Sequence, residues 1–393
     1  MSGELPDLRP LCERVLLQNW REGVRRDGVP FGFSCPSATH YPWQWYWDSC
    51  FHAIAWRRID RERGRRELTS LLDASREDGF IGHTIFWNVP LTGRRRVGYN
   101  VVSPDDLMTA TIQPPLLAWA WRIAVGDPAL EPRIVRHHDW IAAHRDLEGD
   151  GLVWILQPDE TGLDASPQFD PVWGSHSHGR PGFVLLVRHN RRLGFDIARV
   201  RAAGGPVVCE PMTNVLHGLS QLALGRPSIT PALIDRCYDE DAGLFRLDAQ
   251  PAVRERIPIT WAALSPLALP DLPEGIGRRL VEQHLLHEER FWLPVPPPSV
   301  DATDPTFTTD DVHLGLRRYW RGPTWINAAW LVWLGLVRLG YDEPAAEMAR
   351  RLGRTVEREG LREYYHPRTG AGMGQPDFGW SSLILELTEP ATP

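Results

Sequence analysis

The sequence predicts an all-α fold, an (α/α)6 barrel in which six helical hairpins form two concentric rings. Three observations support this prediction. The apolar segments are mostly long and follow helical spacing, Pro and Gly separate them, and strand-like alternation is scarce. About a dozen helices in one chain fit two rings of six. A helical solenoid is the competing architecture, but the chain shows no self-similarity at the roughly 30 to 50 residues typical of such repeats.

Helical spacing defines the expected elements in order. It predicts helices over about residues 11–25, 46–60, 64–76, 114–125, 131–145, 185–203, 211–224, 230–238, 258–268, 275–287, 323–340, 343–359 and 378–388. Several begin with a proline that suits the first helical turn, as in Gln113-Pro114, Glu210-Pro211 and Gly322-Pro323. Closed barrels often exceed the usual domain size, so we expect residues 1–393 to form a single barrel domain.

The connections between these helices are long and rich in Trp, Gly, Pro and His. They span residues 26–45, 78–112, 146–183, 288–322 and 360–377. Long loops in a compact domain tend to carry function. The chain also contains 18 tryptophans, against 8 tyrosines and 12 phenylalanines. Because Trp combines a broad apolar face with one N–H donor, it suits both a large core and the stacking of sugar rings.

Composition excludes several kinds of partner. The net charge is -7 without a dominant basic block, so nucleic acid is not expected. No stretch approaches the roughly 18 apolar residues needed to span a bilayer, and the start, MSGELPDLRPLCERV, lacks an apolar signal core, which favours a cytoplasmic location. The five cysteines include no CxxC pair, so we expect buried free thiols, no metal site and no cofactor. The sequence leaves a homo-oligomer open.

Three acidic residues lie in loops where aromatic and Gly residues surround them. Asp164 ends the stretch PDETGLD, Glu363 opens EYYHPRTGAG, and Asp48 follows the aromatic run YPWQWYW. Each also has a plain structural explanation: Asp48 or Asp164 could cap a helix, and Glu363 could pair with Arg362 or Arg368. Hydrolysis of a glycosidic bond needs one carboxylic acid to protonate the leaving oxygen and one carboxylate to activate water or attack. A short acceptor such as Asp48 suits the binding of sugar hydroxyls.

Four stretches, three of which contain these acidic residues, together resemble glycoside hydrolase family 63, and more narrowly its short bacterial glucosylglycerate and mannosylglycerate hydrolases. They are QWYWDSCFHA at 44–53, ETGLD at 160–164, YWRGPTW at 319–325 and the run from Glu363-Tyr364-Tyr365 to Gly372. Matches in this order extend from about residue 31 to residue 388. The resemblance implies an (α/α)6 barrel and hydrolysis with inversion at the anomeric carbon.

The resemblance also implies roles for individual residues. Asp164 matches the general acid and Glu363 the general base. Trp47, Asp48, Gln113 and Trp325 match positions that line the non-reducing sugar site, and Tyr319 and Trp320 match a pair near the sugar and its aglycone. Further candidate substrate-binding residues in or beside these stretches are Tyr41, Phe86, Trp87, Gly162, Gln375 and Trp380. Gly82 stands where proline is usual and Thr161 replaces the common serine, but neither change removes a carboxylate.

The mechanism implied is that Asp164 protonates the glycosidic oxygen while Glu363 deprotonates a water on the opposite face of the sugar. Room for this water requires carboxyl groups about 6.5–9.5 Å apart, whereas a separation near 5 Å would mean retention through a covalent intermediate. The expected substrate is a small α-linked compound: glucosylglycerate, mannosylglycerate or a short α-glucoside. Arg180, Arg191, Arg199 and Arg201 are equal candidates for binding a carboxylate on the aglycone.

Two other functions fit parts of the sequence. A sugar epimerase on a helical barrel would use paired histidines, for which His83, His137, His138, His176, His178 and His313 are available. A non-catalytic glycan-binding protein would keep the Trp-rich loops without turnover. Product analysis separates these possibilities, because epimerisation yields an isomer, hydrolysis yields two fragments, and a binding protein yields neither.

Overall fold

The computed structural model describes residues 5–87, 107–176, 182–249, 251–313 and 316–389. Helices dominate it. They are α1 (Arg9–Gln18), α2 (Tyr46–Trp56), α3 (Arg61–Ala74), α5 (Leu117–Ala124), α6 (Glu131–Arg145), α7 (Asp170–Trp173), α8 (Phe183–Arg192), α9 (Ile197–Ala202), α10 (Pro211–Ala223), α11 (Thr230–Cys237), α12 (Pro251–Arg254), α13 (Glu274–Arg279), α14 (Ile326–Arg338), α15 (Asp342–Glu359) and α16 (Ile384–Thr388). Short 3-10 segments include η1 (Pro158–Thr161), η2 (Pro167–Phe169), η3 (Gly174–His176), η4 (Trp261–Ala263), η5 (Ser265–Ala268) and η7 (Gly379–Leu383), and Leu280–Leu285 forms a π-helical turn.

The described strands pair only in twos. They are β1 (Trp20–Val24) with β2 (Pro30–Ser34), β3 (Gln44–Trp45) with β4 (Thr84–Ile85), β5 (Trp154–Ile155) with β6 (Val208–Cys209), β7 (Tyr238–Asp239) with β8 (Leu244–Phe245), β9 (Val312–His313) with β10 (Leu316–Arg317), and β11 (Arg362–Tyr365) with β12 (Gly372–Pro376). Every pair is antiparallel. These two-stranded ribbons therefore lie in the connections between helices and do not form a central sheet.

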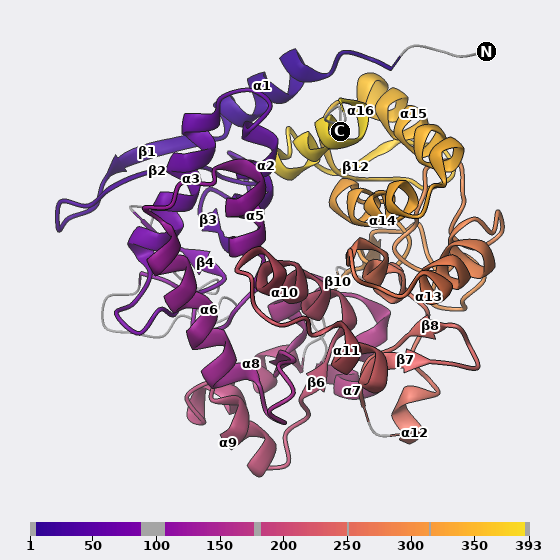
Figure 1. Ribbon diagram of the computed structural model, residues 1–393, viewed down its shortest axis with the longest axis horizontal. Coiled ribbons are helices and arrows are strands. Elements are labelled where there is room, and N and C mark those ends of the chain that lie inside the picture. Colours follow the sequence, from indigo (N-terminus) through magenta and orange to yellow (C-terminus); the bar gives the residue numbers. More distant parts are fainter. Residues whose placement is uncertain (1–4, 88–106, 177–181, 250, 314–315, 390–393) are drawn as a thin grey trace.

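Six inner elements close a ring. Among the described residues, contacts run in a circle from α2 to α5, α10, η5, α14, η7 and back to α2. The chain makes one circuit around this ring, so that its first and last helices lie near one another at the top of Figure 1. An ion pair of 2.6 Å between Arg9 of α1 and Glu389 links the two ends of the described chain. The predicted (α/α)6 barrel is thus confirmed.

The outer elements cover this ring with amphipathic faces. α3 packs on α2, α6 on α5, α11 on α10, and α15 on α14. In α15 the buried residues Ala345, Met348, Ala349, Leu352 and Val356 recur at helical spacing, which defines one apolar stripe. In contrast, every residue of α2 is buried, because this helix is covered on all sides.

Several predicted helices differ from those in the structure. The helix expected over 11–25 ends at Gln18, because residues 20–24 form β1 of a hairpin whose turn contains Asp27-Gly28, with Gly28 at φ +89°. The helix expected over 185–203 divides into α8 and α9, because Gly194 and Phe195 both take positive φ. Segments 258–268 and 378–388 contain 3-10 turns, although an α-helix was expected over each of them.

The core is continuous around the barrel. One cluster of buried hydrophobic residues includes residues from Leu8 to Leu387 and contains most of the tryptophans. All five cysteines are buried free thiols, as expected. Among the described residues, no helix combines the length and apolar character needed to cross a membrane.

Candidate active site

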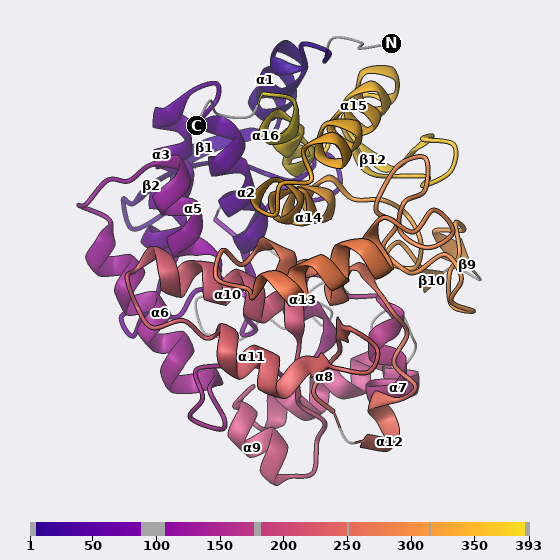
Figure 2. The same ribbon diagram turned by 45° about the vertical axis from the view of Figure 1, so that its right-hand side comes forward.

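Three segments that lie far apart in the chain carry the three acidic residues. The strands β9, β10 and β12 lie on the right of Figure 2, and α7 lies below them on the same side. Asp48 projects from the first turn of the inner helix α2. Asp164 follows η1, and Glu363 is the second residue of β11.

The Asp164 loop is fixed by a buried ion pair. Arg145, at the end of α6, donates from Nη1 and Nη2 to the two oxygens of Glu160 at 2.8 and 2.7 Å. The same carboxylate accepts the backbone N–H of Leu156 at 2.9 Å and that of Ile112, beside Gln113, at 3.2 Å. A fully hydrogen-bonded buried carboxylate of this kind holds η1 against two other segments.

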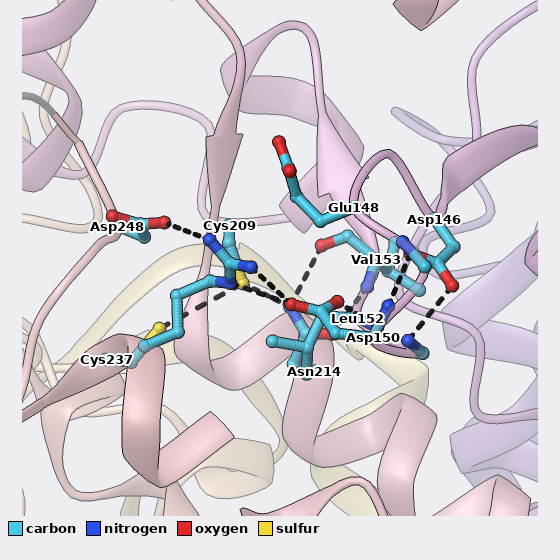
Figure 3. A network of polar contacts seen from close by, with 12 residues as sticks. Asp146, Glu148, Asp150, Leu152, Val153, Cys209, Asn214, Cys237 and Asp248 are labelled. Atoms are coloured by element: carbon cyan, nitrogen blue, oxygen red, sulfur yellow. Dashed lines mark hydrogen bonds and ion pairs between the residues drawn. The ribbon is translucent and has the colours of Figure 1, made fainter. Parts of the chain in front are cut away.

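Strand β5, which leads into this loop, is held by a second polar network (Figure 3). Arg236 donates to Asp150 and, at 3.0 Å, to Asp248. Asn214 of α10 accepts the backbone N–H of Val153 at 2.7 Å and donates to the carbonyl of the same residue at 2.9 Å. These contacts fix the start of the segment that ends at Asp164.

Gly162 brings the loop into contact with Trp47. This glycine has φ +71°, and a Cβ at its position would lie only 2.6 and 2.7 Å from two atoms of the Trp47 ring. The backbone N–H of Trp47 in turn donates to Gln113 Oε1 at 3.0 Å. Gly162, Trp47 and Gln113, three residues predicted from the family motifs, therefore meet at one place.

Tyr319 contacts Asp164 directly. Its hydroxyl donates to Asp164 Oδ2 at 2.8 Å, and its ring packs against Trp325 and Tyr364 with centroids 5.9 and 6.2 Å away. The pKa of Tyr319 is raised well above its usual value, first by burial and then by the charges of Asp164, Tyr41 and Glu363. Both Asp164 and Glu363 are therefore electrostatic neighbours of the Tyr319 hydroxyl.

Glu363 is 5% exposed and is held by the β11–β12 hairpin. Its Oε2 accepts the backbone N–H of Gln375 at 3.0 Å. Gly374, at φ +64°, makes this approach possible, because a Cβ there would lie 2.7 Å from the same oxygen. Gln375 thus contacts Glu363 through its backbone N–H.

A group of aromatic rings connects these segments. Trp380 meets Trp47 edge-on at 5.2 Å and Trp325 at 5.5 Å between centroids. Trp325 stacks on Trp320 at 3.9 Å and packs on Tyr364 at 4.6 Å. Residues from α2, the 319–325 loop, β11 and η7 therefore form one aromatic cluster.

Asp48 is an acidic residue whose pKa is strongly perturbed. Burial raises its pKa to about 7, with the charges of Glu363 and Glu67 adding to the rise and His52 opposing it. Its Oδ1 is buried and has no hydrogen-bond partner among the described residues, and neither has Trp380 Nε1. Buried polar atoms normally have partners, so this acceptor and donor suit the hydroxyls of a ligand.

Three other predicted residues pack against aromatic and polar neighbours. Trp87 stacks on Phe31 at 4.9 Å and donates from Nε1 to Gln44 at 2.7 Å, while Phe86 packs on Trp43. The ring of Tyr41 packs between Trp45 and Phe378, and its charge acts on Tyr319. Trp87 therefore contacts β2 and β3, and Phe86 contacts Trp43, the residue before Gln44 of β3.

Several of the candidate arginines and histidines lie within the described residues, where most have partners or are buried. Arg199 and Arg201 of α9 pair with Asp196 and Glu148, and Arg191 is exposed on α8. His137 and His138 are buried in the core, and His83 stacks on Trp45. Arg180 and His178 lie outside the described residues. No group of three or more His, Cys, Asp or Glu in the described part of the chain could hold a metal ion.

Several buried polar residues that support the site were not predicted from the sequence. Arg145 and Glu160 are one example, and His52 with Glu67 is another. Asp159 is a third: its pKa is raised well above the usual value by burial and by the charge of Asp164, while the Gln157 amide donates to it at 2.7 Å. In the first two examples the partners lie on different elements, and the spacing within one element gives no signal of such a contact.

The (α/α)6 barrel with carboxyl groups set among tryptophans has the groups that a glycoside hydrolase requires, and the family match places the protein in that class. Residues 41–381 match the family described as the mannosylglycerate hydrolase MGH1-like glycoside hydrolase domain, and the chain belongs to this family. The predicted relation to glycoside hydrolase family 63 is confirmed.

Known relatives cover nearly the whole chain. A mannosylglycerate hydrolase of Thermus thermophilus is 29% identical, covering 90% of this chain and 95% of the relative. The glucosylglycerate hydrolase of Mycolicibacterium hassiacum is 24% identical, covering 88% and 91%. The crystal structure of a family 63 mannosylglycerate hydrolase from a second Thermus thermophilus strain, in complex with Tris and D-glycerate, superposes with a TM-score of 0.77 at 26% identity, covering 98% of this chain and all of that one.

Proposed function

We propose that this chain is an inverting α-glycoside hydrolase that cleaves mannosylglycerate or glucosylglycerate. The observation that carries the proposal is the position of Tyr319: its hydroxyl bonds to Asp164, and the charges of both Asp164 and Glu363 act on it. Two carboxyl groups that lie 199 residues apart in the sequence thus share one neighbour. An acid and a base that act on one substrate must lie near each other in this way. The names of the relatives support the choice of substrate.

In this proposal Asp164 protonates the glycosidic oxygen, and Glu363 accepts a proton from the water that attacks the anomeric carbon from the opposite face. Asp48 and Trp380 supply an acceptor and a donor for sugar hydroxyls. Trp47 and Trp325 offer rings for packing against the sugar and excluding bulk water. We further infer that residues 1–393 act as one domain, supported by the continuous core from Leu8 to Leu387.

The substrate experiment is a screen of the purified protein against mannosylglycerate, glucosylglycerate and short α-linked disaccharides. We expect release of hexose and glycerate, with NMR showing the β-anomer of the sugar first. Initial release of the α-anomer would contradict inversion. An isomerised product without fragments would favour an epimerase, and binding without any product would favour a glycan-binding protein.

The role experiment compares Asp164→Asn and Glu363→Gln with wild type. Each proton transfer typically contributes about 10²- to 10⁴-fold, so each variant is expected to lose turnover by that order with little change in melting temperature. Asp196→Asn, which changes a partly exposed carboxylate at the start of α9, is the matched control and should keep normal turnover. Near-normal turnover in either test variant would remove its residue from the proposed mechanism.

A further inference from the structure

Two contacts join the segment that carries Asp164 to the loop that carries Tyr319. One is the hydrogen bond of 2.8 Å from the Tyr319 hydroxyl to Asp164 Oδ2. In the other, Nη2 of Arg321 donates to both carboxylate oxygens of Asp170, at 2.9 and 2.8 Å. Both contacts therefore connect residues 164–170, the acid segment, with residues 319–325, the tyrosine loop.

The ion pair is largely shielded from solvent. The side chain of Arg321 is 9% exposed and that of Asp170 is 23% exposed. Ion pairs on the surface are screened by water and salt and hold their partners loosely, whereas a partly buried pair is screened much less. The second contact is thus suited to fixing a geometry.

The tyrosine loop transmits the position of Arg321 to Tyr319. The indole Nε1 of Trp325 donates to the Tyr319 carbonyl at 3.1 Å, which closes the loop on itself. The Arg321 carbonyl accepts the backbone N–H of Thr308 at 2.8 Å, which ties the loop to a preceding segment. A displacement of Arg321 would therefore be passed to the tyrosine two residues before it.

The acid segment has its own anchors after Asp164. Phe169 is fully buried, and Gln168 Oε1 accepts the Thr260 hydroxyl at 3.2 Å. The ion pair of Asp170 follows at the end of the segment. One hydrogen bond leaves two segments free to rotate about it, but two contacts at separate points fix their relative orientation. Reacting groups need this kind of support, because small errors in their placement are costly.

We propose that Arg321 and Asp170 are a positioning pair, which fixes the acid segment against the tyrosine loop at a second point. With the two segments fixed, the Tyr319 hydroxyl stays on Asp164, and the Asp164 carboxyl is held where it can protonate the leaving oxygen. This inference rests on the proposed function, because it takes Asp164 as the general acid. The pair acts through the Tyr319 hydroxyl and is itself assigned no contact with the substrate.

The experiment compares two leaving groups in Arg321→Gln and Asp170→Asn. One substrate is the compound found in the screen, and the other is the α-fluoride of the same hexose. In the fluoride reaction water attacks the anomeric carbon, the C–F bond breaks and Glu363 takes the proton of the water. Fluoride is so weak a base that it leaves without a proton from Asp164.

We expect a loss that depends on the leaving group. Misplacement of the acid by about 1 Å should lower kcat on the screened substrate by about 10- to 100-fold, while KM and the hydrolysis of the fluoride change by no more than about threefold. Asp164→Asn is the reference variant, because removal of the acid itself should show the same dependence on the leaving group more strongly.

Two variants serve as controls. Asp73 has a side chain that is 22% exposed and accepts a hydrogen bond from Arg133 at 2.8 Å, between α3 and α6, so Asp73→Asn should keep normal activity on both substrates. Because a single nitrogen of Arg321 contacts Asp170, the ammonium group of a lysine can replace it. Arg321→Lys should therefore recover most of the turnover that Arg321→Gln loses.

A double-mutant cycle tests whether the pair acts through Tyr319. If it does, Arg321→Gln combined with Tyr319→Phe should lose no more turnover than the more impaired single variant. Losses that multiply would show independent effects and would overturn the inference. If wild type cleaves the screened substrate but not the fluoride, this cycle decides the matter alone.

Other results would also overturn the inference. Equal losses on both substrates would indicate a general disturbance of the fold, and a change confined to KM would indicate that Arg321 binds the substrate. In contrast, a wild type that hydrolyses no glycoside, or an Asp164→Asn variant without dependence on the leaving group, refutes the proposed function itself. Should the single variants not fold, Arg321→Met combined with Asp170→Leu leaves no unpaired buried charge and is judged by the same criteria.

Discussion

Tyr319 is the residue that interacts with both carboxyl groups of the proposed reaction. Its hydroxyl hydrogen can be donated to one acceptor, and Asp164 Oδ2 receives it at 2.8 Å. Because this oxygen is engaged, the bond fixes how the Asp164 carboxyl is rotated relative to a substrate. Orientation of a reacting group within a few tenths of an ångström is worth a large part of catalysis.

Tyr319→Phe tests this role. The ring should keep its packing against Trp325 and Tyr364, while the hydroxyl that orients Asp164 is lost, so we expect kcat/KM to fall by about 10- to 100-fold with an unchanged melting temperature. Tyr364→Phe is the control, because that hydroxyl donates to Asp311 at 2.8 Å and not to a carboxyl group of the site. An equal loss in both variants would show that the effect is general to the aromatic cluster.

The contrast between motif residues and supporting residues explains what sequence could predict at this scale. Asp48, Asp164 and Glu363 stand out because aromatic and Gly residues adjoin them in the chain. His52 and Glu67 lie inside ordinary helical patterns, and their contact depends on the packing of α2 against α3. When a carboxylate on one helix contacts a residue on another, the spacing of apolar residues within either helix does not indicate the contact.

The loop from Pro158 to Asp164 is the element that most directly sets the site. Its 3-10 turn ends at Gly162, whose left-handed conformation redirects the chain, and Trp47 fills the space where a side chain would lie. The Arg145–Glu160 ion pair holds the other end of the turn. A left-handed backbone conformation and close packing therefore coincide at one glycine, two residues before Asp164.

Gly162→Ala separates these effects when compared with Gly225→Ala. Gly225 has a similar φ of +68° with nothing near its Cβ position, so alanine there should cost only the backbone strain, about 1–2 kcal/mol, with normal turnover. Alanine at 162 adds a clash with Trp47, and displacement of the loop by about 1 Å should lower kcat/KM by about 100-fold. Thermal melts and kinetics of both variants provide the comparison, and equal kinetics would refute the argument.

The elements themselves were predictable where one helical face is buried. Helix α6 was expected over 131–145 and is found there, and α15 differs from its prediction by one residue. The predictions failed where tertiary contacts select another backbone, as in η5, which closes the inner ring between α10 and α14 as a 3-10 turn. Spacing of apolar residues distinguishes poorly between an α-helix and such a turn when every side chain is buried.

At the scale of the whole molecule, the barrel encloses three histidines in its wall. His137 Nδ1 lies 3.0 Å from the Gly79 carbonyl and its Nε2 lies 2.8 Å from the Tyr46 hydroxyl, a pair of contacts that a neutral ring satisfies by donating to one and accepting from the other. His138 Nε2 accepts the backbone N–H of Ala118 at 3.3 Å, and His217 contacts Gln221. These histidines join α6 to α2 and α5, and the ring of His138 stacks on that of His217 of α10 with centroids 6.2 Å apart.

Burial lowers the pKa of His137 to about 4 and that of His217 to about 3, and it places that of His138 well below its usual range. In an unfolded chain each would titrate near 6.5. Between these limits the unfolded state binds protons that the folded state does not, so these groups make the free energy of unfolding fall as the pH drops from about 6.5 to about 4. Asp48 acts in the opposite direction, because its raised pKa lets the folded state hold a proton that the unfolded state releases.

His217→Gln isolates the contribution of one histidine from that of Asp48. One unbalanced proton changes the free energy of unfolding by about 1.4 kcal/mol per pH unit, so the variant should lose up to this much of the acid-side slope between pH 6 and pH 5. Urea unfolding at a series of pH values measures the slope. His144→Gln, on the exposed side of α6, should retain the wild-type slope. If His217→Gln also retains it, then His217 takes up its proton in the folded barrel, and the acid sensitivity must arise from other groups.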